Sequence, residues 1–266
     1  MYRVASFVAL GVLLAAPAAP AYPVQVTPDH DPDLRRAESL DEELLEAETV
    51  DVETYLTDAR RIERIDEELR TGFASLAHVG KAVSVFGSAR TPPGHPEYEH
   101  AREAARKLGE AGFAIITGGG PGVMEAANRG AKEAGVASIG LDIELPHEQF
   151  ENVYVDIGLR FHYFFTRKVM FVRYASAFVV FPGGFGTLDE LFEAATLRQT
   201  NKIRHFPIVL FGTEYWKGLI DWMKGPVVEA GNIVADDAAW LLMTDSVDEV
   251  VRIVEAADHR RPRVAA

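Results

Sequence analysis

Short apolar runs alternate with longer amphipathic stretches along most of the chain. Runs of about 4–8 apolar residues bounded by turn residues are typical of strands that are buried on both faces of a parallel sheet. Helical patterns lie between these runs, and this alternation predicts an α/β fold with a doubly wound parallel sheet. The predicted strands are residues 82–86, 113–116, 137–143, 175–180, 207–211 and 241–243, with a shorter one at 153–155. The predicted helices are residues 97–110, 161–171, a segment ending near Gln199, 215–223 and 247–256.

The region before residue 81 follows a different pattern. Residues 24–33 are rich in Pro and Asp and are typical of a linker. Residues 37–76 carry apolar positions at helical spacing, which predicts one or two acidic amphipathic helices. We expect this extension to pack on the core or on a second subunit, with a structural rather than a chemical role.

The first residues form a leader that supports two interpretations. A charged start, an apolar run up to Ala16 and the Ala-Pro-Ala at 19–21 are the parts of a secretory signal peptide, although the run is short for a membrane span. The alternative is a translation start set too far upstream, but the next methionine is Met124, so a later start would need a non-AUG codon. The predicted organisation is a leader at 1–23, an acidic linker and helical extension at 24–80, a sheet domain at 81–258 and a disordered tail at 259–266.

The formal net charge of −13 is concentrated in the extension. Between Asp29 and Glu68 there are 16 acidic and 5 basic residues, so the rest of the chain is close to neutral. A near-neutral domain does not repel an anionic substrate, and no basic stripe indicates a nucleic-acid partner. The chain has no cysteine, which excludes disulfides, thiolate zinc sites and a cysteine nucleophile, while other nucleophiles stay open.

A glycine-rich turn, Pro-Gly-Gly-Phe-Gly-Thr-Leu-Asp-Glu at 182–190, follows the apolar run 175–180 and precedes a helical pattern. Its three glycines let the backbone approach a ligand closely. Thr187 is predicted to cap the helix and to leave its first N–H groups pointing outward, which makes an anion site. The simpler interpretation is a strand-to-helix turn in which Thr187 and Glu190 form a capping box, and both can hold together.

A second glycine-rich turn, Gly-Gly-Gly-Pro-Gly at 118–122, has the same strand-to-helix context. No Gly-Lys-Ser/Thr follows, so it is not a P-loop, and it does not match G-x-G-x-x-G in register. A dinucleotide oxidoreductase is therefore a weaker alternative, with Asp142 at the end of the next strand where a ribose-binding acid would fall. We expect ligand contacts from this turn and from the one after the first strand, at Gly87, Ser88, Gly119, Gly120 and Met124.

Two cations interrupt the strongly apolar helix predicted at 161–171. Arg167 and Lys168 either extend to solvent or present positive charge to a ligand anion, because charges in buried surroundings must be paired. We prefer the second interpretation. His162, in the same segment, is expected to be a satisfied polar residue rather than a catalyst.

Taken together, the motifs resemble those of the LOG ("lonely guy") family. The matching segments are residues 118–127, 165–168, 182–190 and 211–216, within a similarity that covers about residues 82–254. Members of this family are cytokinin riboside 5′-monophosphate phosphoribohydrolases that were long mislabelled lysine decarboxylases. The resemblance implies a Rossmann-like catalytic domain. Glu125 stands where shorter plant-type members carry glycine, and those members lack the acidic extension, so cytokinin specificity does not follow.

The resemblance also implies roles for single residues. The catalytic pair would be Glu190 and Arg167. The substrate-binding residues would be Lys168 and a 5′-phosphate cradle formed by Gly183, Gly184, Gly186 and Thr187.

The implied reaction releases the free base and ribose 5-phosphate from a nucleoside 5′-monophosphate such as AMP. Hydrolysis of an N-glycosidic bond develops positive charge on the sugar, which a nearby carboxylate stabilises. Glu190, close to a helix N-terminus, is predicted to stay ionised and to act as a base or an electrostatic group rather than as an acid. Arg167 could hold the phosphate or assist departure of the base.

We expect no metal, nicotinamide or pyridoxal phosphate cofactor, and no lysine stands out for a Schiff base. The expected partners are a small nucleotide and further copies of the chain, as a homodimer or larger, without nucleic acid or membrane. The expected location is the cytoplasm, or outside the cell if residues 1–21 are a genuine signal peptide. The alternative function is a nucleotide-binding sensor or carrier without turnover.

Overall fold

The computed structural model describes residues 52–145, 151–203 and 206–258, with side chains from residue 58 onward. The expected leader, the linker, the segment 37–51 and the tail at 259–266 lie outside the described residues. Within these ranges, no helix combines the length and the apolar character needed to cross a membrane.

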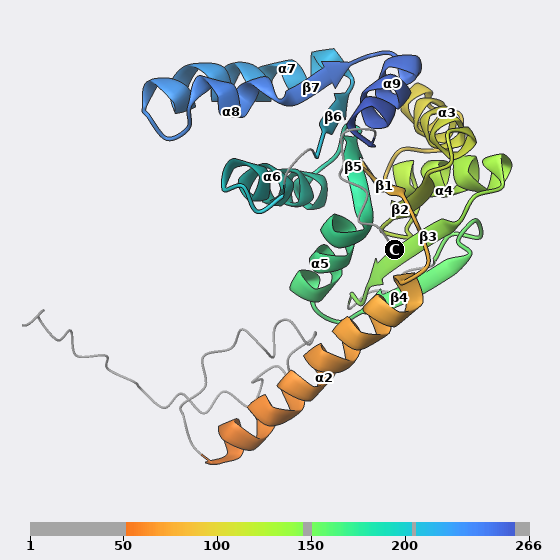
Figure 1. The fold of residues 1–266 in the computed structure, drawn as a ribbon, viewed down its shortest axis with the longest axis vertical. Helices are drawn as coiled ribbons and strands as arrows, with labels where there is room; N and C mark the ends of the chain where they lie inside the picture. Colours follow the sequence, from red (N-terminus) through yellow and green to blue (C-terminus); the bar gives the residue numbers. More distant parts are fainter. Residues whose placement is uncertain (1–51, 146–150, 204–205, 259–266) are drawn as a thin grey trace, which may run out of the picture. The chain divides into compact units, whose positions relative to one another are not determined.

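One sheet of seven parallel strands forms the centre of the described chain, in the order β4-β3-β2-β1-β5-β6-β7 (Figure 1). The fold is therefore the α/β class that the sequence predicts, with a doubly wound parallel sheet. β1 and β5 are buried along their whole length, as their continuous apolar runs require. The strands are β1 Ala82–Phe86, β2 Ala114–Thr117, β3 Ser138–Ile143, β4 Ile157–Phe161, β5 Ala175–Val180, β6 Ile208–Phe211 and β7 Leu241–Thr244.

Helices cover both faces of this sheet and form two hydrophobic cores. One face carries α2 Val52–Leu76, α5 Phe164–Tyr174, α6 Phe185–Gln199, α7 Thr213–Trp222 and α8 Ala235–Ala239, with a π-helical turn η1 at Met223–Val227. The other face carries α3 Pro96–Glu110, α4 Val123–Ala134 and α9 Val247–Asp258. The described part of the extension packs on the domain, since Leu76 in α2 is 1% exposed.

The strand order places a switch in chain direction between β1 and β5. From β1 the chain moves outward through β2 and β3 to β4, and it then returns to the other side of β1. The loops that follow β1 and β5 touch, because Ser88 N donates to Pro182 O at 2.9 Å. Open α/β sheets bind ligands in the crevice at such a point.

The β4 edge of the sheet departs from the sequence prediction. The expected strand at 153–155 is wrong, and so is a helix that starts at Phe161, because β4 is Ile157–Phe161 and α5 begins at Phe164. β4 pairs with β3 alone and is partly exposed at alternate positions. Gly158 and Arg160 occupy its outward positions, so no continuous apolar run marked it.

Candidate active site

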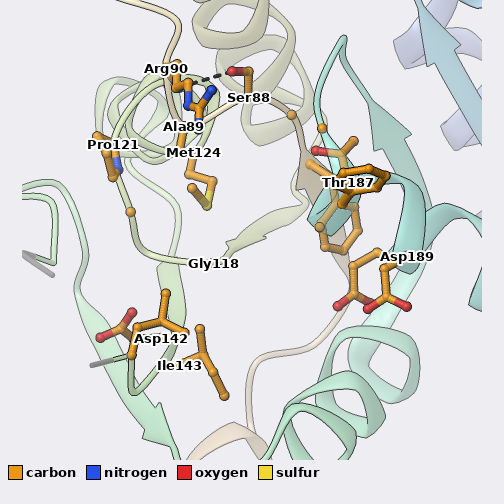
Figure 2. Close-up of a pocket in the computed structure, with 18 of the residues that line it drawn as sticks. Ser88, Ala89, Arg90, Gly118, Pro121, Met124, Asp142, Ile143, Thr187 and Asp189 are labelled. Carbon is orange, nitrogen blue, oxygen red and sulfur yellow. Dashed lines mark hydrogen bonds between the residues drawn. The ribbon is translucent and has the colours of Figure 1, made fainter. Parts of the chain in front are cut away.

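A cavity of about 690 Å³ opens at the carboxyl ends of the central strands (Figure 2). Its walls come from the loops after β1, β2 and β3 and from the first turns of α4, α5 and α6. These segments are distant in sequence and meet because their strands are neighbours in the sheet. The volume is in the range of small-molecule sites.

The start of α6 forms one wall of the cavity. The helix begins at Phe185, and Gly184 is its N-cap without a side-chain hydrogen bond. The predicted Thr187 cap is therefore wrong, and so is the capping box with Glu190, because both residues lie inside the helix. The physical reason is packing: a Cβ at Gly183 would overlap Thr187 Oγ1, so the buried Thr187 side chain closes on Gly183.

Two glycines of this turn have no packing reason to be glycine. Neither has a positive φ, and apart from adjacent residues and the backbone of α6 itself, no atom of the described residues lies within 4 Å of a Cβ built at Gly184 or Gly186. Both residues line the cavity. Glycine at these positions keeps the first N–H groups of α6 open to a ligand, and the N-terminus of a helix favours an anion.

Glu190 reaches the same cavity from the second turn of α6. It is 5% exposed, and its Oε2 atom is buried without a hydrogen-bond partner among the described residues. Burial raises the pKa of Glu190 to about 7, against the lowering effect of the Lys168 and Arg167 charges. The prediction that the helix dipole keeps Glu190 ionised did not include this burial, which raises the pKa of Glu190 because the dipole acts mainly within the first turn.

Arg167 faces Glu190 from helix α5. Its Nε donates to Leu141 O at 2.8 Å, and the guanidinium lies 5.0 Å from the centre of the Phe171 ring. Burial lowers the pKa of Arg167, and the charges of Glu190 and Asp142 oppose this effect. A guanidinium remains charged at neutral pH. The backbone of Gly118 passes so close that a Cβ there would lie 2.5 Å from Arg167 Nη2.

Lys168 points elsewhere. Its Nζ lies 2.8 Å from Asp189 Oδ1 and 2.9 Å from Glu193 Oε2, both on α6, and its side chain is 15% exposed. It is absent from the described lining of the cavity. Lys168 therefore lies beside the site and lowers the pKa of Glu190 through its charge.

The loops after β1 and β2 interlock through close backbone contacts. A Cβ at Gly87 would lie 2.6 Å from Val123 Cγ1, and Val123 N donates to Ser88 O at 3.0 Å. Asn152 holds the β2 loop, because its Nδ2 donates to Gly119 O at 2.9 Å and to Gly120 O at 3.0 Å. These contacts hold the loops after β1 and β2 together beside the cavity.

Most of the residues predicted for the site are brought together by the fold. Those that line the cavity are Gly87, Ser88, Gly120, Met124, Arg167, Gly184, Gly186, Thr187 and Glu190. Gly119, Gly183 and Lys168 are absent from the described lining, because the first two pack against neighbouring protein and the third pairs with α6.

The cavity also contains residues that the sequence reasoning did not assign to the site. Arg90 and Phe185 line it and are exposed, Phe185 by 92%. Figure 2 places Arg90 at the same end of the cavity as Ser88. Asp142 lines the opposite side of the cavity, and its Oδ2 lies 3.6 Å from Arg160 Nε. Burial raises the pKa of Asp142. The sequence did contain a signal for Arg90, because a cation two residues after Ser88, in a turn that follows a strand, is well placed to meet an anionic ligand.

Comparisons with known proteins agree with this geometry. A family model described as "possible lysine decarboxylase" matches residues 124–254. A pyrimidine/purine nucleotide 5′-monophosphate nucleosidase of Escherichia coli is 29% identical over 198 residues, which cover 62% of this chain and 41% of that protein. A cytokinin riboside 5′-monophosphate phosphoribohydrolase of Mycobacterium tuberculosis is 28% identical over 183 residues, covering 64% of this chain and 91% of that protein.

The family model and these relatives support the resemblance to the LOG family. The chain spans about two fifths of the length of the Escherichia coli relative. Among solved structures, a molybdenum cofactor carrier protein of Chlamydomonas reinhardtii matches with a TM-score of 0.52 at 22% identity, over 68% of this chain and 99% of that one. This likeness supports the Rossmann-like fold. Among the described residues, no group of three or more metal-ligating side chains gathers.

Glu190 should make the stability of the protein depend on pH. Its pKa is about 7 in the folded protein and 4.5 in its ordinary state, so the unfolded chain releases the proton first and stability falls as pH rises from 4.5 to 7. Glu190→Gln cannot ionise, so we expect it to melt at a higher temperature than wild type at pH 8 and at nearly the same temperature at pH 4.5. Calorimetry at both pH values measures this difference. Glu214→Gln, at an exposed position on α7, is the control. An equal difference in melting temperature between Glu190→Gln and wild type at both pH values would contradict a pKa of Glu190 that is raised by burial.

Gly186 should show opposite effects on stability and on binding. Alanine is favoured over glycine inside a helix by about 0.5–1 kcal/mol, so Gly186→Ala should stabilise the fold. Its methyl group would enter the open space before the α6 N–H groups and weaken the binding of inorganic phosphate. Gly218→Ala, in α7 with equally open surroundings, is the matched control and should leave binding unchanged. Calorimetric titration tests both variants, and wild-type phosphate affinity in Gly186→Ala would place the anion elsewhere.

Proposed function

We propose that this protein hydrolyses the N-glycosidic bond of nucleoside 5′-monophosphates to the free base and ribose 5-phosphate. The observation that carries the proposal is the buried carboxyl group of Glu190, whose Oε2 lacks a hydrogen-bond partner among the described residues. A buried carboxyl group with a strongly perturbed pKa in a cavity is a signature of a functional site. Such a group is costly in a folded protein unless a ligand uses it.

The phosphate is assigned to the N-terminus of α6. Gly184 and Gly186 leave the N–H groups open there, and Thr187 adds a hydroxyl group to the lining of the same wall. Arg90 supplies a positive charge that a phosphate entering the cavity can reach. Both features favour a 5′-monophosphate over the uncharged nucleoside.

The sugar is assigned to the space next to Glu190. Cleavage of the bond between C1′ and the base leaves an oxocarbenium-like sugar, which the Glu190 carboxylate stabilises. The same carboxylate takes one proton from the attacking water as the new C1′–O bond forms. A pKa of about 7 suits this proton transfer at neutral pH.

Arg167 is assigned to the departing base. Its Nε is held by Leu141 O, so the remaining N–H groups have a fixed direction. A hydrogen bond from this guanidinium stabilises the negative charge that develops on the base as its bond to C1′ breaks. The base then receives a proton from solvent and Glu190 returns its proton to solvent, so that the overall reaction adds one water molecule across the bond.

The names of the relatives support this reaction. The Escherichia coli relative is a nucleotide 5′-monophosphate nucleosidase, and the Mycobacterium tuberculosis relative is a phosphoribohydrolase acting on cytokinin riboside 5′-monophosphate. Both names describe cleavage between a base and a ribose phosphate. A sensor or carrier that binds the nucleotide without turnover is the competing function, and base release distinguishes the two.

We expect wild-type protein to release adenine from AMP with a kcat/KM at least ~100-fold above that for adenosine, because phosphate binding orients the sugar. Glu190→Ala should lower kcat by at least ~100-fold and keep the affinity for AMP within ~10-fold, because the carboxylate acts mainly in the transition state. Chromatography of the released base and calorimetric titration measure these values. Equal cleavage of AMP and adenosine would exclude the phosphate role, and wild-type kcat in Glu190→Ala would exclude the catalytic one.

We also propose that the protein is a homodimer or a larger homo-oligomer. Phe165 and Val169 lie one turn apart on α5 and are 44% and 41% exposed, and Phe192 on α6 is 40% exposed. Apolar side chains that are exposed together favour an interface.

Light scattering at micromolar concentration should therefore give at least twice the monomer mass. Val169→Glu should shift the protein toward monomer, because it would bury a charge in the proposed interface. Val234→Glu, at a 63% exposed position before α8, should leave the mass unchanged. A monomeric wild type, or equal dissociation by both variants, would contradict the proposed interface.

A further inference from the structure

The acidic helix α2 makes a polar contact with the segment that carries Arg167. Glu68, a residue of α2, is 9% exposed, and its side chain lies beside the first turn of α5. Its Oε2 accepts a hydrogen bond from Thr166 Oγ1 at 2.6 Å, and its Oε1 accepts one from His162 N at 2.9 Å. Oε1 also lies 2.7 Å from His162 Nδ1. One buried carboxylate thus holds both sides of the turn that begins α5.

Glu68 brings negative charge from α2 to the N-terminus of α5. Its N-cap residue, Tyr163, makes no side-chain capping bond, and the first turn contains no acidic residue. Negative charge near a helix N-terminus is stabilising, and Glu68 supplies it from α2. Glu144, directly after β3, extends the contact, because its Oε2 lies 2.9 Å from His162 Nε2.

The two helices also approach closely beyond Glu68. A Cβ at Gly72 would lie 2.7 Å from Met170 Cε, so glycine permits the contact. Further along, the Arg173 guanidinium lies 4.8 Å from the centre of the Phe73 ring. Residue numbers rise along both helices from one contact to the next, so α2 and α5 run parallel here. Of these three contacts, the one made by Glu68 is next to the active site.

Thr166 links this contact to the cavity. It is fully buried, and the next residue, Arg167, lines the cavity and donates to Leu141 O. A shift of the first turn of α5 therefore moves the Arg167 guanidinium relative to Glu190. Small displacements of a catalytic group have large effects on rate, because the reacting groups must be held in a narrow range of geometries.

We infer that Glu68 is a positioning residue for Arg167, so that α2 is part of the catalytic apparatus and not only a support. This inference rests on the proposed function. It differs from the expectation that the extension has a purely structural role. It also assigns His162 and Thr166 to the connection between Glu68 and the cavity.

The test compares full-length wild type with Glu68→Ala, Glu68→Gln and Thr166→Val. We expect Glu68→Ala to lower kcat for AMP by at least ~10-fold, while the inhibition constant of ribose 5-phosphate changes by less than ~2-fold, because the phosphate site on α6 is untouched. Glu68→Gln should lower kcat by a smaller factor than Glu68→Ala, because the amide oxygen can still accept the hydrogen bond from Thr166. Thr166→Val removes the hydrogen bond between Thr166 and Glu68 without changing α2. This variant therefore replaces Glu68→Ala in the test if Glu68→Ala does not fold.

Arg173→Ala is the matched control, because it removes a contact between the same helices away from the cavity. It should keep kcat within ~2-fold of wild type. A double variant, Glu68→Ala with Thr166→Val, should lower kcat by less than the product of the two single effects, because both substitutions remove the same hydrogen bond. Wild-type kcat in Glu68→Ala, or an equal loss in Arg173→Ala, would overturn the positioning role.

A second readout does not depend on turnover. The Nε–H resonance of Arg167, identified by its loss in Arg167→Lys, should exchange with water faster in Glu68→Ala than in wild type or Arg173→Ala. If wild type releases no base from any nucleotide, the proposed function fails, and this exchange rate still tests whether Glu68 positions Arg167. Unchanged exchange in Glu68→Ala would overturn the inference in either case.

Discussion

The pairing of β1 with β5 is the contact on which the site depends. These two strands lie side by side although the chain forms β2, β3 and β4 between them. Their ends bring the Ser88 loop against the Pro182 turn, and the β2 loop joins them through Val123. The cavity exists because three strand-to-helix turns meet at the carboxyl ends of neighbouring parallel strands.

The glycines at this junction serve two different physical needs. Gly87 and Gly183 are required by protein packing, because a side chain there would overlap Val123 or Thr187. Gly184 and Gly186 face open space and have no such reason. Packing glycines let the turns interlock, and open glycines keep backbone donors accessible. Glycine-rich motifs combine both kinds, and only neighbouring atoms distinguish them.

Electrostatics at the cavity follows from unequal burial of neighbouring charges. Glu190 is buried and its pKa rises to about 7, while Asp189, the residue before it, is exposed and pairs with Lys168. Lys168 and Arg167 both lower the pKa of Glu190, yet neither forms a direct ion pair with it within the described contacts. The fold thereby keeps a carboxyl group poised between its two protonation states near neutral pH.

Helix α2 shows how an extension can reach the centre of a domain. Its carboxylate Glu68 adds negative charge beside the N-terminus of α5 and accepts a hydrogen bond from Thr166. Arg167, the residue after Thr166, lines the cavity. An acidic amphipathic helix carries no sequence mark for such a contact, since most of its carboxylates face solvent. The role of Glu68 depends on a partner about a hundred residues away.

The order of strands and helices was predictable from the sequence, because buried parallel strands are continuous apolar runs and β1 and β5 were located to the residue. The two glycine-rich turns were predictable for the same local reason. The edge strand β4 was not, since it is held by pairing with β3 and its own residues alternate. Tertiary structure alone decided that Thr187 packs on Gly183 instead of capping α6, that Lys168 pairs with Asp189, and that burial raises the pKa of Glu190. Local pattern specifies backbone conformation, whereas side-chain pairing and burial depend on residues that only folding brings together.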